Sequence, residues 1–253
     1  MSALSVREIE AKSILNASKI YDYCVNPYTG CQVGCAYCYA ALFMRRYSGH
    51  SEPWGEFVDA KVNAPALLAR QIVKARRGTI WFASVCDCYQ PLEERYGLTR
   101  RSLEVLAGRD FPVVIQTKSA RIRRDLDVIK RIPGVEVGFS IASADETIIR
   151  VFERMSSPVR ERIEVLREFK AAGIATFAFA GPLLPGDPER LAALLDGAAD
   201  RVLIDRMNYV PAVKAFYARQ GLLDALTDSF FATQAARLAK ALRARGLRVE
   251  KVF

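Results

Sequence analysis

The sequence predicts an α/β fold: an open, partial (β/α)6 TIM-type barrel with a helical C-terminal extension. Short apolar runs recur along the chain without polar alternation, as is typical of strands buried on both faces of a parallel sheet. Segments with helical spacing of apolar residues separate these runs. Six such strand–helix units follow one another between residues 19 and 205, fewer than the eight of a closed barrel.

One domain is expected over residues 1–253, because no polar linker long enough to separate two domains interrupts the pattern. The core barrel should occupy about residues 19–210. The remainder, residues 211–253, should form helices and a short strand.

The first third of the chain predicts a strand, a helix, a loop and a second helix. Glycine, serine, proline and acidic residues indicate a surface loop after the first helix. Leu67, Leu68, Ile72 and Val73 share one side of the second helix, which Gly78 should end. The expected elements are an edge strand or arm at 1–19, a core strand at 19–25, a helix at 39–47, the loop at 48–60 and a helix at 64–77.

From residue 79 onward, strands and helices alternate. Thr99 should cap one helix and Ser143 another, with Asp145 in the first turn of the latter, because such side chains satisfy free N–H groups at a helix start. Pro158 should occupy the first position of a long helix. The expected strands are 79–85, 113–117, 135–142, 174–180, 201–205 and 247–253. The other expected helices are 99–108, one that carries Ile122, Leu126 and Ile129 and is ended by Pro133 and Gly134, 158–173, 187–197 and those within 211–245.

Composition and charge narrow the class of protein. A hydrophobic fraction of 51% with 26% charged residues is ordinary for a soluble globular chain. No window approaches the roughly 18 apolar residues of a membrane span, so no membrane partner is expected. The start of the chain lacks the apolar stretch of a secretory signal, which predicts a reducing, cytoplasmic location. The net charge of +9 favours a polyanionic partner, nucleic acid first; the alternative is a solvated basic surface.

Three cysteines, Cys31, Cys35 and Cys38, fall at C-x3-C-x2-C spacing on a loop that Gly30 and Gly34 allow to bend tightly. Cysteine thiolates hold iron–sulfur clusters, and a [4Fe–4S] cluster has four irons. Three ligands therefore leave one iron open to a ligand that is not a cysteine. The alternatives are a zinc site, which needs four ligands while the only histidine lies well down the chain, and a disulfide framework, which suits small secreted chains.

The run from Asn26 to Ala40 resembles the cluster loop of radical S-adenosylmethionine (radical SAM) enzymes, with Tyr37 as the aromatic residue before the last cysteine. More narrowly, it resembles the spore photoproduct lyase-like branch, also called DNA repair photolyase-like. The resemblance continues in family order through residues 48–55, 87–91, 98–100, 117–119 and 182–186.

The resemblance implies a [4Fe–4S] cluster on the three cysteines, with S-adenosyl-L-methionine on the open iron. It implies that Asp87 accepts a hydrogen bond from the methionyl ammonium, that Lys118 or Ser140 meets the carboxylate or ribose, and that Tyr37 lies near the adenine. An external electron donor of flavodoxin or ferredoxin type would drive cleavage to methionine and a 5′-deoxyadenosyl radical, which takes hydrogen from a substrate.

Polar residues in the apolar runs add candidates. Ser84 and Ser140 are costly to bury unless partnered, so we expect them to bind cofactor; the alternative is a hydroxyl bonded to its own backbone. By resemblance, Cys86 or Cys88 returns a hydrogen atom to the substrate radical, or Ser84 occupies that position. The alternatives are two buried cysteines acting as small hydrophobes and, for Lys118, an ordinary surface lysine.

The expected function is a radical SAM enzyme acting on nucleic acid, either a lesion-repairing lyase or a base-modifying enzyme. Arginines near predicted strand ends would contact phosphates. They are Arg45, Arg46, Arg100, Arg101, Arg121, Arg123 and Arg124. The alternatives are a radical SAM enzyme acting on a small metabolite or peptide, and a non-catalytic iron–sulfur protein.

Overall fold

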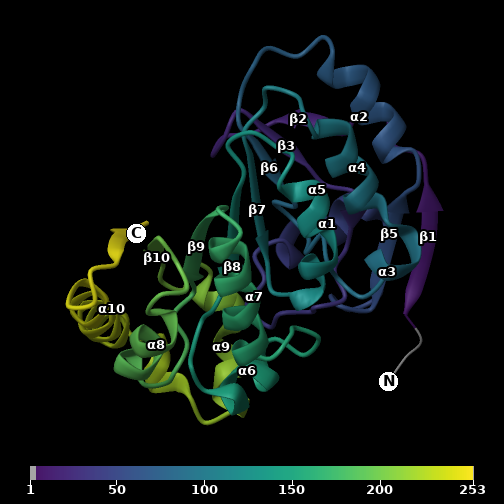
Figure 1. Ribbon diagram of the computed structural model, residues 1–253. Coiled ribbons are helices and arrows are strands. Elements are labelled where there is room, and N and C mark those ends of the chain that lie inside the picture. Colours follow the sequence, from purple (N-terminus) through teal and green to yellow (C-terminus); the bar gives the residue numbers. More distant parts are fainter. Residues whose placement is uncertain (1–3, 253) are drawn as a thin grey trace. The chain divides into compact units, whose positions relative to one another are not determined.

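The structure, a computed structural model, describes residues 4–252 apart from the side chains of Arg45 and Arg46 (Figure 1). The chain divides into two compact units. Unit 1 comprises residues 1–34 and 40–137, and unit 2 comprises residues 35–39 and 138–253. Each unit contains buried apolar residues of its own. The single domain expected over residues 1–253 stays a prediction.

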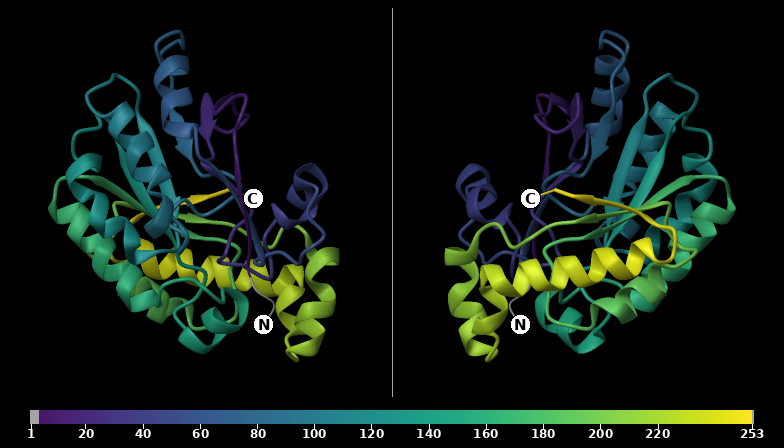
Figure 2. Two further views of the ribbon diagram at one scale, coloured as in Figure 1. Left: turned by 90° about the vertical axis from the view of Figure 1, so that its right-hand side faces the viewer. Right: turned by 90° about the vertical axis from the view of Figure 1, so that its left-hand side faces the viewer.

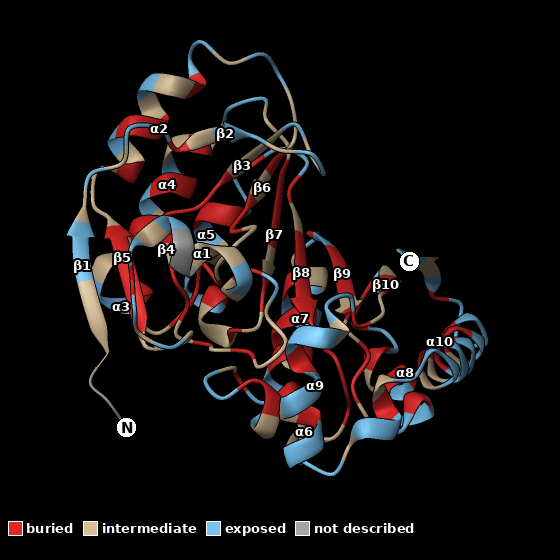
Figure 3. Cartoon of the chain, turned by 180° about the vertical axis from the view of Figure 1, so that it is seen from behind, coloured by how far each residue is buried: buried red, intermediate tan, exposed pale blue. Residues whose placement is uncertain are grey.

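Unit 1 contains strands in the order β7, β6, β3, β2. The strands β3 (Tyr23–Val25), β6 (Ile80–Phe82) and β7 (Val113–Thr117) are parallel, and β2 (Leu15–Ala17) pairs antiparallel with β3. Most of β7 is buried, as its apolar run requires (Figure 3). Since the three parallel strands point the same way, their carboxyl ends meet at one edge.

A second, three-stranded sheet in unit 1 has the order β1 (Ser5–Ile9), β5 (Phe57–Lys61), β4 (Tyr28–Thr29). Strand β5 is parallel to β1 and antiparallel to β4. Helix α2 packs against α4, and α4 packs against α5. The helices of unit 1 are α1 (Ala41–Ser48), α2 (Ala64–Ile72), α3 (Glu93–Tyr96), α4 (Leu98–Leu106), the 3-10 helix η1 (Ala120–Asp125) and α5 (Leu126–Ile129).

Unit 2 contains strands in the order β11, β10, β9, β8. They are β8 (Glu136–Ser140), β9 (Ala175–Ala180), β10 (Arg201–Ile204) and β11 (Arg248–Lys251), and β9, β10 and β11 are mutually parallel. Helix α7 packs against β9, and the long α10 packs against α8 and β11 (Figure 2). The helices are α6 (Glu146–Phe152), α7 (Val159–Ala171), α8 (Pro188–Leu195), α9 (Val210–Arg219), η2 (Leu223–Leu226) and α10 (Asp228–Arg243).

The α/β class is confirmed, as is each predicted core strand, in the form of β3, β6, β7, β8, β9 and β10. Helices α9 and α10 with β11 form the expected C-terminal extension. Strands β2 and β11 each have a neighbour on one side only, as an open sheet requires. The predicted N-terminal arm contains β1 and β2, and its residues 1–3 lie outside the described part.

The loop predicted over residues 48–60 is wrong in its last part, because β5 begins at Phe57. Asp59 indicated an exposed loop, yet it is buried between the buried Val58 and Ala60. The Nε2 atom of His50 lies 2.9 Å from Asp59 Oδ1, and this partner allows the acid to face the interior.

The helix predicted over residues 64–77 ends at Ile72. Val73 was expected on the buried side with Leu67 and Leu68, but it is 70% exposed. The next four residues, Lys-Ala-Arg-Arg, offer no large apolar side chain. Tertiary packing supplies most helical stability in proteins, so the helix ends before Gly78.

Thr99 does not cap α4. Instead, the Glu93 carboxylate accepts from the backbone N–H groups of Thr99 and Arg100 at 3.0–3.3 Å, and the Thr99 hydroxyl donates to the carbonyl of Cys88 at 2.8 Å. The helix predicted to carry Ile122 and Ile129 and to end at Pro133 is split into η1 and α5, and α5 ends earlier, at Ile129. Asp125, at this junction, is held by Arg100 at 3.1 Å, a partner that helical spacing does not reveal.

Two further helix starts are corrected. Asp145, not Ser143, caps α6, because its side chain accepts from Thr147 N. The Ser143 hydroxyl instead donates to the carbonyl of Pro185 at 2.7 Å. Pro158 precedes α7 as its cap residue, one position before the predicted one.

Close packing in unit 2 predicts that Gly138→Ala lowers the free energy of unfolding by about 1–3 kcal/mol. A Cβ atom on Gly138 would lie 2.1 Å from Cζ of Phe177, far inside van der Waals contact. Urea denaturation of the two proteins measures the change.

The matched control is Phe177→Leu, alone and combined with Gly138→Ala. The double variant should lose less stability than the sum of the single ones, because the smaller side chain makes room for the methyl group. Additive losses would contradict the described contact.

Candidate active site

The residues that follow β3, β6 and β7 lie at the carboxyl edge of the parallel strands of unit 1. The backbone after β6 begins in an unusual conformation, since Ala83 has a φ of 63°. A residue other than glycine in this left-handed region carries strain, which is often found at functional sites. Ser84, Cys86, Asp87 and Cys88 follow immediately.

Asn26, directly after β3, holds the start of this segment. Its Nδ2 donates to Ser84 Oγ at 3.0 Å, and its Oδ1 accepts from Val85 N at 3.0 Å. The Cys86 sulfur lies 4.0 Å from the same Oδ1. The predicted cofactor-binding Ser84 therefore contacts a side chain of the neighbouring strand.

Asp87 joins the ends of β6 and β7. One carboxylate oxygen accepts from the Thr117 hydroxyl at 2.6 Å and from Tyr89 N at 2.9 Å, and the other accepts from Lys118 N at 2.7 Å. A carboxylate has about four acceptor positions, so three are used here. Asp87 is a positioning group in this structure and retains room for one further donor. Lys118 is half-buried at the end of β7.

The two predicted hydrogen donors flank Asp87. Cys88 is fully buried and Cys86 is half-buried. Burial raises the pKa of both thiols, with further upward contributions from the nearby Cys31 for Cys86 and from Asp87 for both. Both sulfurs therefore keep their hydrogen at neutral pH, as hydrogen-atom donation requires.

The first part of the cysteine loop is fixed to the segment after β6. Gly30 has a φ of 85° and comes so close to Phe57 that a Cβ would lie 2.3 Å from its carbonyl oxygen. The Asp87 N–H points to Cys31 Sγ at 3.3 Å. Gln32 N donates to Gln90 Oε1 at 2.8 Å, and Gln32 Oε1 accepts from Leu92 N at 2.6 Å.

The second part of the loop, residues 35–39, belongs to unit 2 and is anchored there. The Tyr37 hydroxyl donates to Glu153 Oε1, and Ala36 N donates to the carbonyl of Phe152 at 2.9 Å. Glu153 Oε2 pairs with the buried Arg162 guanidinium at 2.7 Å. Burial, followed by the charge of Glu153, raises the pKa of Tyr37, which stays a neutral donor.

Arg162 also places the predicted Ser140. Its Nη1 atom donates to the carbonyl of Ser140 at 2.8 Å, and its Nε atom donates to the carbonyl of Ser157 at 2.7 Å. Ser140 is the last residue of β8 and is buried. The same buried pair thus fixes both the loop around Tyr37 and the end of β8.

The donor set fits an iron–sulfur cluster. Cys31 and Cys35 are buried, Cys38 is half-buried, and all three lie on one loop of eight residues without forming a disulfide among the described residues. Beside Cys31, the buried Nε2 of Gln90 finds no hydrogen-bond partner within residues 4–252, so the site offers an unused donor to a sulfur. Among the described side chains, no three from His, Cys, Asp and Glu are grouped to hold a single metal ion.

Most of the predicted phosphate-binding arginines are engaged. Arg100 pairs with Asp125 and Asp127, Arg121 with Glu94, and Arg124 with Glu93. Arg101 donates to backbone carbonyls, and the side chains of Arg45 and Arg46 lie outside the described part. These contacts reduce the positive charge available to a nucleic acid.

Sequence reasoning missed several residues that organise the site. Asn26 and Thr117 stand next to predicted strand ends, and their position was an available signal. Glu153 and Arg162 carried no such signal, because each is an ordinary charged residue of a helical segment until the fold joins them. Lys61 was missed because it directly follows the wrongly predicted loop. Its ammonium donates to the carbonyl of Asn26 at 2.9 Å.

Comparison with known sequences gives a consistent result. Residues 25–198 match the family described as the radical SAM superfamily. An uncharacterized protein of Methanocaldococcus jannaschii is 34% identical over 186 residues, covering 73% of this chain and 70% of that protein. An uncharacterized protein of Mycobacterium bovis is 31% identical over 196 residues, covering 72% of this chain and 57% of that protein. The chain thus spans little more than half of the mycobacterial protein.

Solved structures show the fold. A spore photoproduct lyase complexed with a dinucleoside spore photoproduct has a TM-score of 0.69 at 17% identity, over 98% of this chain and 82% of that one. A variant of this lyase with bound AdoMet and the dinucleoside spore photoproduct has a TM-score of 0.68, and the match covers 97% of this chain and 81% of that one. SuiB of Streptococcus suis bound to precursor peptide SuiA has a TM-score of 0.61 at 12% identity, and the match covers 99% of this chain and 49% of that one. These likenesses confirm the predicted fold class.

The buried pair of unit 2 predicts that Glu153→Gln lowers the free energy of unfolding by about 3–5 kcal/mol, because it leaves the Arg162 charge without its partner. Chemical denaturation measures the loss. Glu164→Gln, which breaks an exposed pair with Arg160 in the same unit, should change stability by less than about 1 kcal/mol.

The double variant Glu153→Gln with Arg162→Met removes the uncompensated charge and should recover part of the loss. Equal effects of Glu153→Gln and Glu164→Gln would show that the buried pair does not hold this part of the unit.

Proposed function

Because the chain belongs to the radical SAM superfamily, we propose that it is an enzyme that cleaves S-adenosylmethionine reductively and directs the resulting radical at nucleic acid. A [4Fe–4S] cluster and S-adenosylmethionine are the cofactors of this superfamily. The reaction would be lesion repair of the spore photoproduct lyase type or modification of a base. An external flavodoxin or ferredoxin in a reducing cytoplasm would supply the electron.

One contact carries the proposal. The Asp87 N–H lies 3.3 Å from Cys31 Sγ, so Cys86 and Cys88 are the chain neighbours of a residue that touches a predicted cluster ligand. A thiol beside the radical source is the chemistry that a hydrogen-returning lyase needs. Cys31, Cys35 and Cys38 would hold the cluster, which with S-adenosylmethionine supplies a carbon-centred radical when bound.

The residues around the loop then have defined tasks. Asp87 would offer its remaining acceptor position to the methionyl ammonium, while Thr117 and the backbone of Lys118 keep its carboxylate in place. The Tyr37 ring, with its hydroxyl fixed by Glu153, would border the adenine. The Lys118 ammonium or the Ser140 hydroxyl would bind the carboxylate or ribose.

Cys86 would act after the substrate radical has formed. Its S–H bond breaks, the hydrogen atom passes to the substrate carbon, and the unpaired electron remains on sulfur. Asn26 orients this segment by donating to the Ser84 hydroxyl and accepting from the backbone N–H of Val85, so Asn26 and the segment would act as one group. Cys88 is the second candidate donor, and Ser84 the candidate if neither cysteine faces the substrate.

A second function is favoured by another observation. The fold is similar to that of a peptide-bound protein, SuiB, and three of the predicted phosphate-binding arginines, Arg100, Arg121 and Arg124, are paired with acids. A peptide or a small metabolite as substrate would use the same cofactor residues. A non-catalytic iron–sulfur protein is the third candidate. It has the least support, because all of the predicted cofactor-binding residues are present in the chain.

No helix among the described residues is long and apolar enough to span a membrane.

We expect Cys35→Ala to lose the cluster, and with it the formation of 5′-deoxyadenosine, because two thiolates remain where three are needed. Protein reconstituted anaerobically with iron and sulfide is assayed for iron content and, after dithionite and S-adenosylmethionine, for 5′-deoxyadenosine by mass spectrometry. Cys24→Ala is the matched control, since Cys24 lies on β3 outside the motif and should retain both. Loss of the cluster in both variants would contradict the ligand assignment.

The substrate prediction is that UV-irradiated DNA yields repaired thymine in the same reaction, dependent on Cys35. Unirradiated DNA is the control and should yield none. Deoxyadenosine without thymine recovery would exclude the lesion-repair reaction and favour base modification or the peptide and metabolite alternative. An intact cluster without any deoxyadenosine would contradict the proposed enzyme.

A further inference from the structure

A pocket of about 430 Å³ opens in unit 1 among strands β1, β2, β4, β5 and helix α1. None of the three loop cysteines lines it, so it is separate from the predicted cluster. Its polar lining includes Arg7, Asn16, Asn26, Asp59 and Lys61, and Tyr47 stands among its aromatic and apolar residues. Pockets of this size accommodate small organic ligands or part of a larger one.

We propose that this pocket binds a backbone phosphate of the nucleic acid substrate, with Lys61 and Arg7 as its cationic contacts. The proposal rests on the function proposed above and adds the site that would hold the substrate strand. It concerns residues of the N-terminal strands that the cofactor chemistry does not use.

Lys61 is a cation that makes no ion pair among the described residues, although the charge of Asp59 acts on it. Its ammonium donates to the carbonyl of Asn26 at 2.9 Å, and it forms no ion pair with any residue that the structure describes. An ammonium has three donors, so two remain. The side chain is half-buried, and burial lowers its pKa. The charge of Asp59 partly opposes this lowering, but Asp59 forms no ion pair with Lys61, so a partly desolvated ammonium remains that an anion can bind.

The one acidic residue of the pocket lining is already engaged. Asp59 Oδ1 lies 2.9 Å from Nε2 of His50, whose Nδ1 lies 3.1 Å from Glu52. The imidazole also stacks on Phe57, with the ring centres 4.2 Å apart. Asp59 is thus oriented toward His50 and does not come within 4.0 Å of the Lys61 ammonium.

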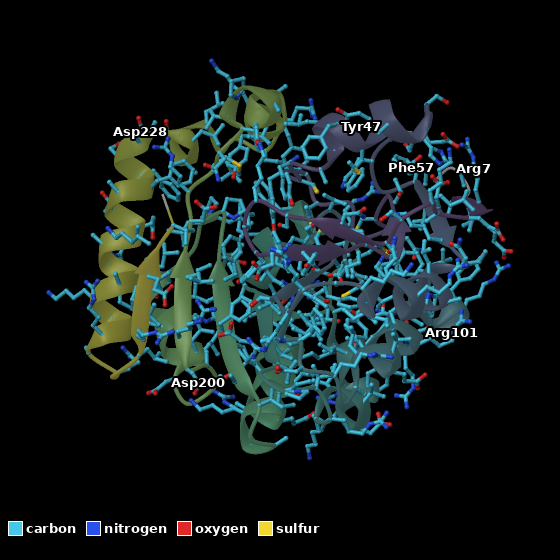
Figure 4. All side chains as sticks on the ribbon, turned by 90° about the horizontal axis from the view of Figure 1, so that it is seen from above. Arg7, Tyr47, Phe57, Arg101, Asp200 and Asp228 are labelled. Atoms are coloured by element: carbon cyan, nitrogen blue, oxygen red, sulfur yellow. The ribbon has the colours of Figure 1, made fainter. Side chains whose placement is uncertain are left out.

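Arg7 is the second cation. It is exposed on β1, and within the described residues it forms no ion pair, unlike Arg100, Arg121 and Arg124. Tyr47 on α1 is 78% exposed, which is unusual for so large a ring. Figure 4 shows Arg7, Tyr47 and Phe57 on the ribbon of unit 1. A basic group and an open aromatic ring are the two contacts that single-stranded nucleic acid uses, phosphate by charge and base by stacking.

The pocket is continuous with the predicted reactive segment. Asn26 and Val85 line it, and they are the residues that bond to each other at 3.0 Å beside Ser84 and Cys86. A phosphate on Lys61 would therefore share the pocket with Val85, which directly precedes the predicted hydrogen donor Cys86 in the chain. Two cations without ion pairs, lining the pocket with one engaged acid, favour the anionic non-bridging oxygens of a phosphodiester over a peptide, whose backbone is neutral.

The test is the salt dependence of binding. A fluorescently labelled single-stranded oligothymidylate is titrated with the reconstituted full-length protein at several salt concentrations, and the anisotropy gives Kd. Lys61→Gln should raise Kd about tenfold and reduce the slope of log K against log salt by about 0.7, the loss of one phosphate contact on a single strand. Arg7→Gln should act in the same direction, and since Arg7 is exposed, this variant should fold normally.

Two controls isolate the pocket. Lys74→Gln removes an exposed charge of the same unit outside the pocket and should leave slope and Kd near those of the native protein. Lys61→Arg keeps the charge and should restore the slope. If Lys61→Gln and Arg7→Gln match Lys74→Gln, the pocket does not bind phosphate and the proposal fails.

Two competitors identify the ligand. Inorganic phosphate that displaces the oligonucleotide from the native protein but not from Lys61→Gln would support the phosphate contact. An oligoglutamate peptide that binds with a Lys61-dependent slope, while the oligonucleotide shows none, would overturn the nucleic-acid assignment. Formation of deoxyadenosine without any substrate is measured separately, so a failure of the proposed enzyme and a failure of the pocket give different results.

Discussion

Three thiols on an eight-residue loop can hold a cluster only if the backbone that presents them is fixed, and buried polar side chains at both ends of the loop fix it. Before Cys35, Gln32 and Gln90 bond the loop to the segment after β6. After Cys35, the hydroxyl of Tyr37 meets Glu153, whose charge is balanced by Arg162. Buried polar groups are costly unless they are partnered, so these contacts fix the first part of the loop within unit 1 and the second part within unit 2.

The same principle governs the strand ends. Polar side chains in the segments after β3 and β6 bond to the neighbouring strand or to the segment that follows it. Asn26 reaches from β3 to the segment after β6, and Asp87 reaches from there to Thr117 on β7. The chain of contacts leaves the backbone around Cys86 with little freedom, which is the condition for placing a reactive thiol accurately.

The extent to which the fold could be predicted follows from how far apart the interacting residues lie in the sequence. Buried parallel strands are continuous apolar runs, and the cysteine motif is contiguous, so both could be recognised in the sequence. The group that accepts hydrogen bonds from the first N–H groups of α4 could not be recognised in this way, because it is the carboxylate of Glu93, which lies outside the helix. Strand β5 was missed because Asp59 is buried with His50. Tyr37 and Glu153 are 116 residues apart, a separation across which no local pattern operates. The roles of the site residues stay predictions.

Asn26 touches both the pocket and the reactive segment, since its carbonyl accepts from Lys61 while its side chain bonds to Val85 and Ser84. Two events are thermodynamically linked when both favour the same position of a shared residue. Any ligand that binds more tightly when Asn26 is in this position must, to the same extent in free energy, stabilise Asn26 in it. If the pocket binds the substrate as proposed, phosphate binding and the ordering of the segment around Cys86 would stabilise each other.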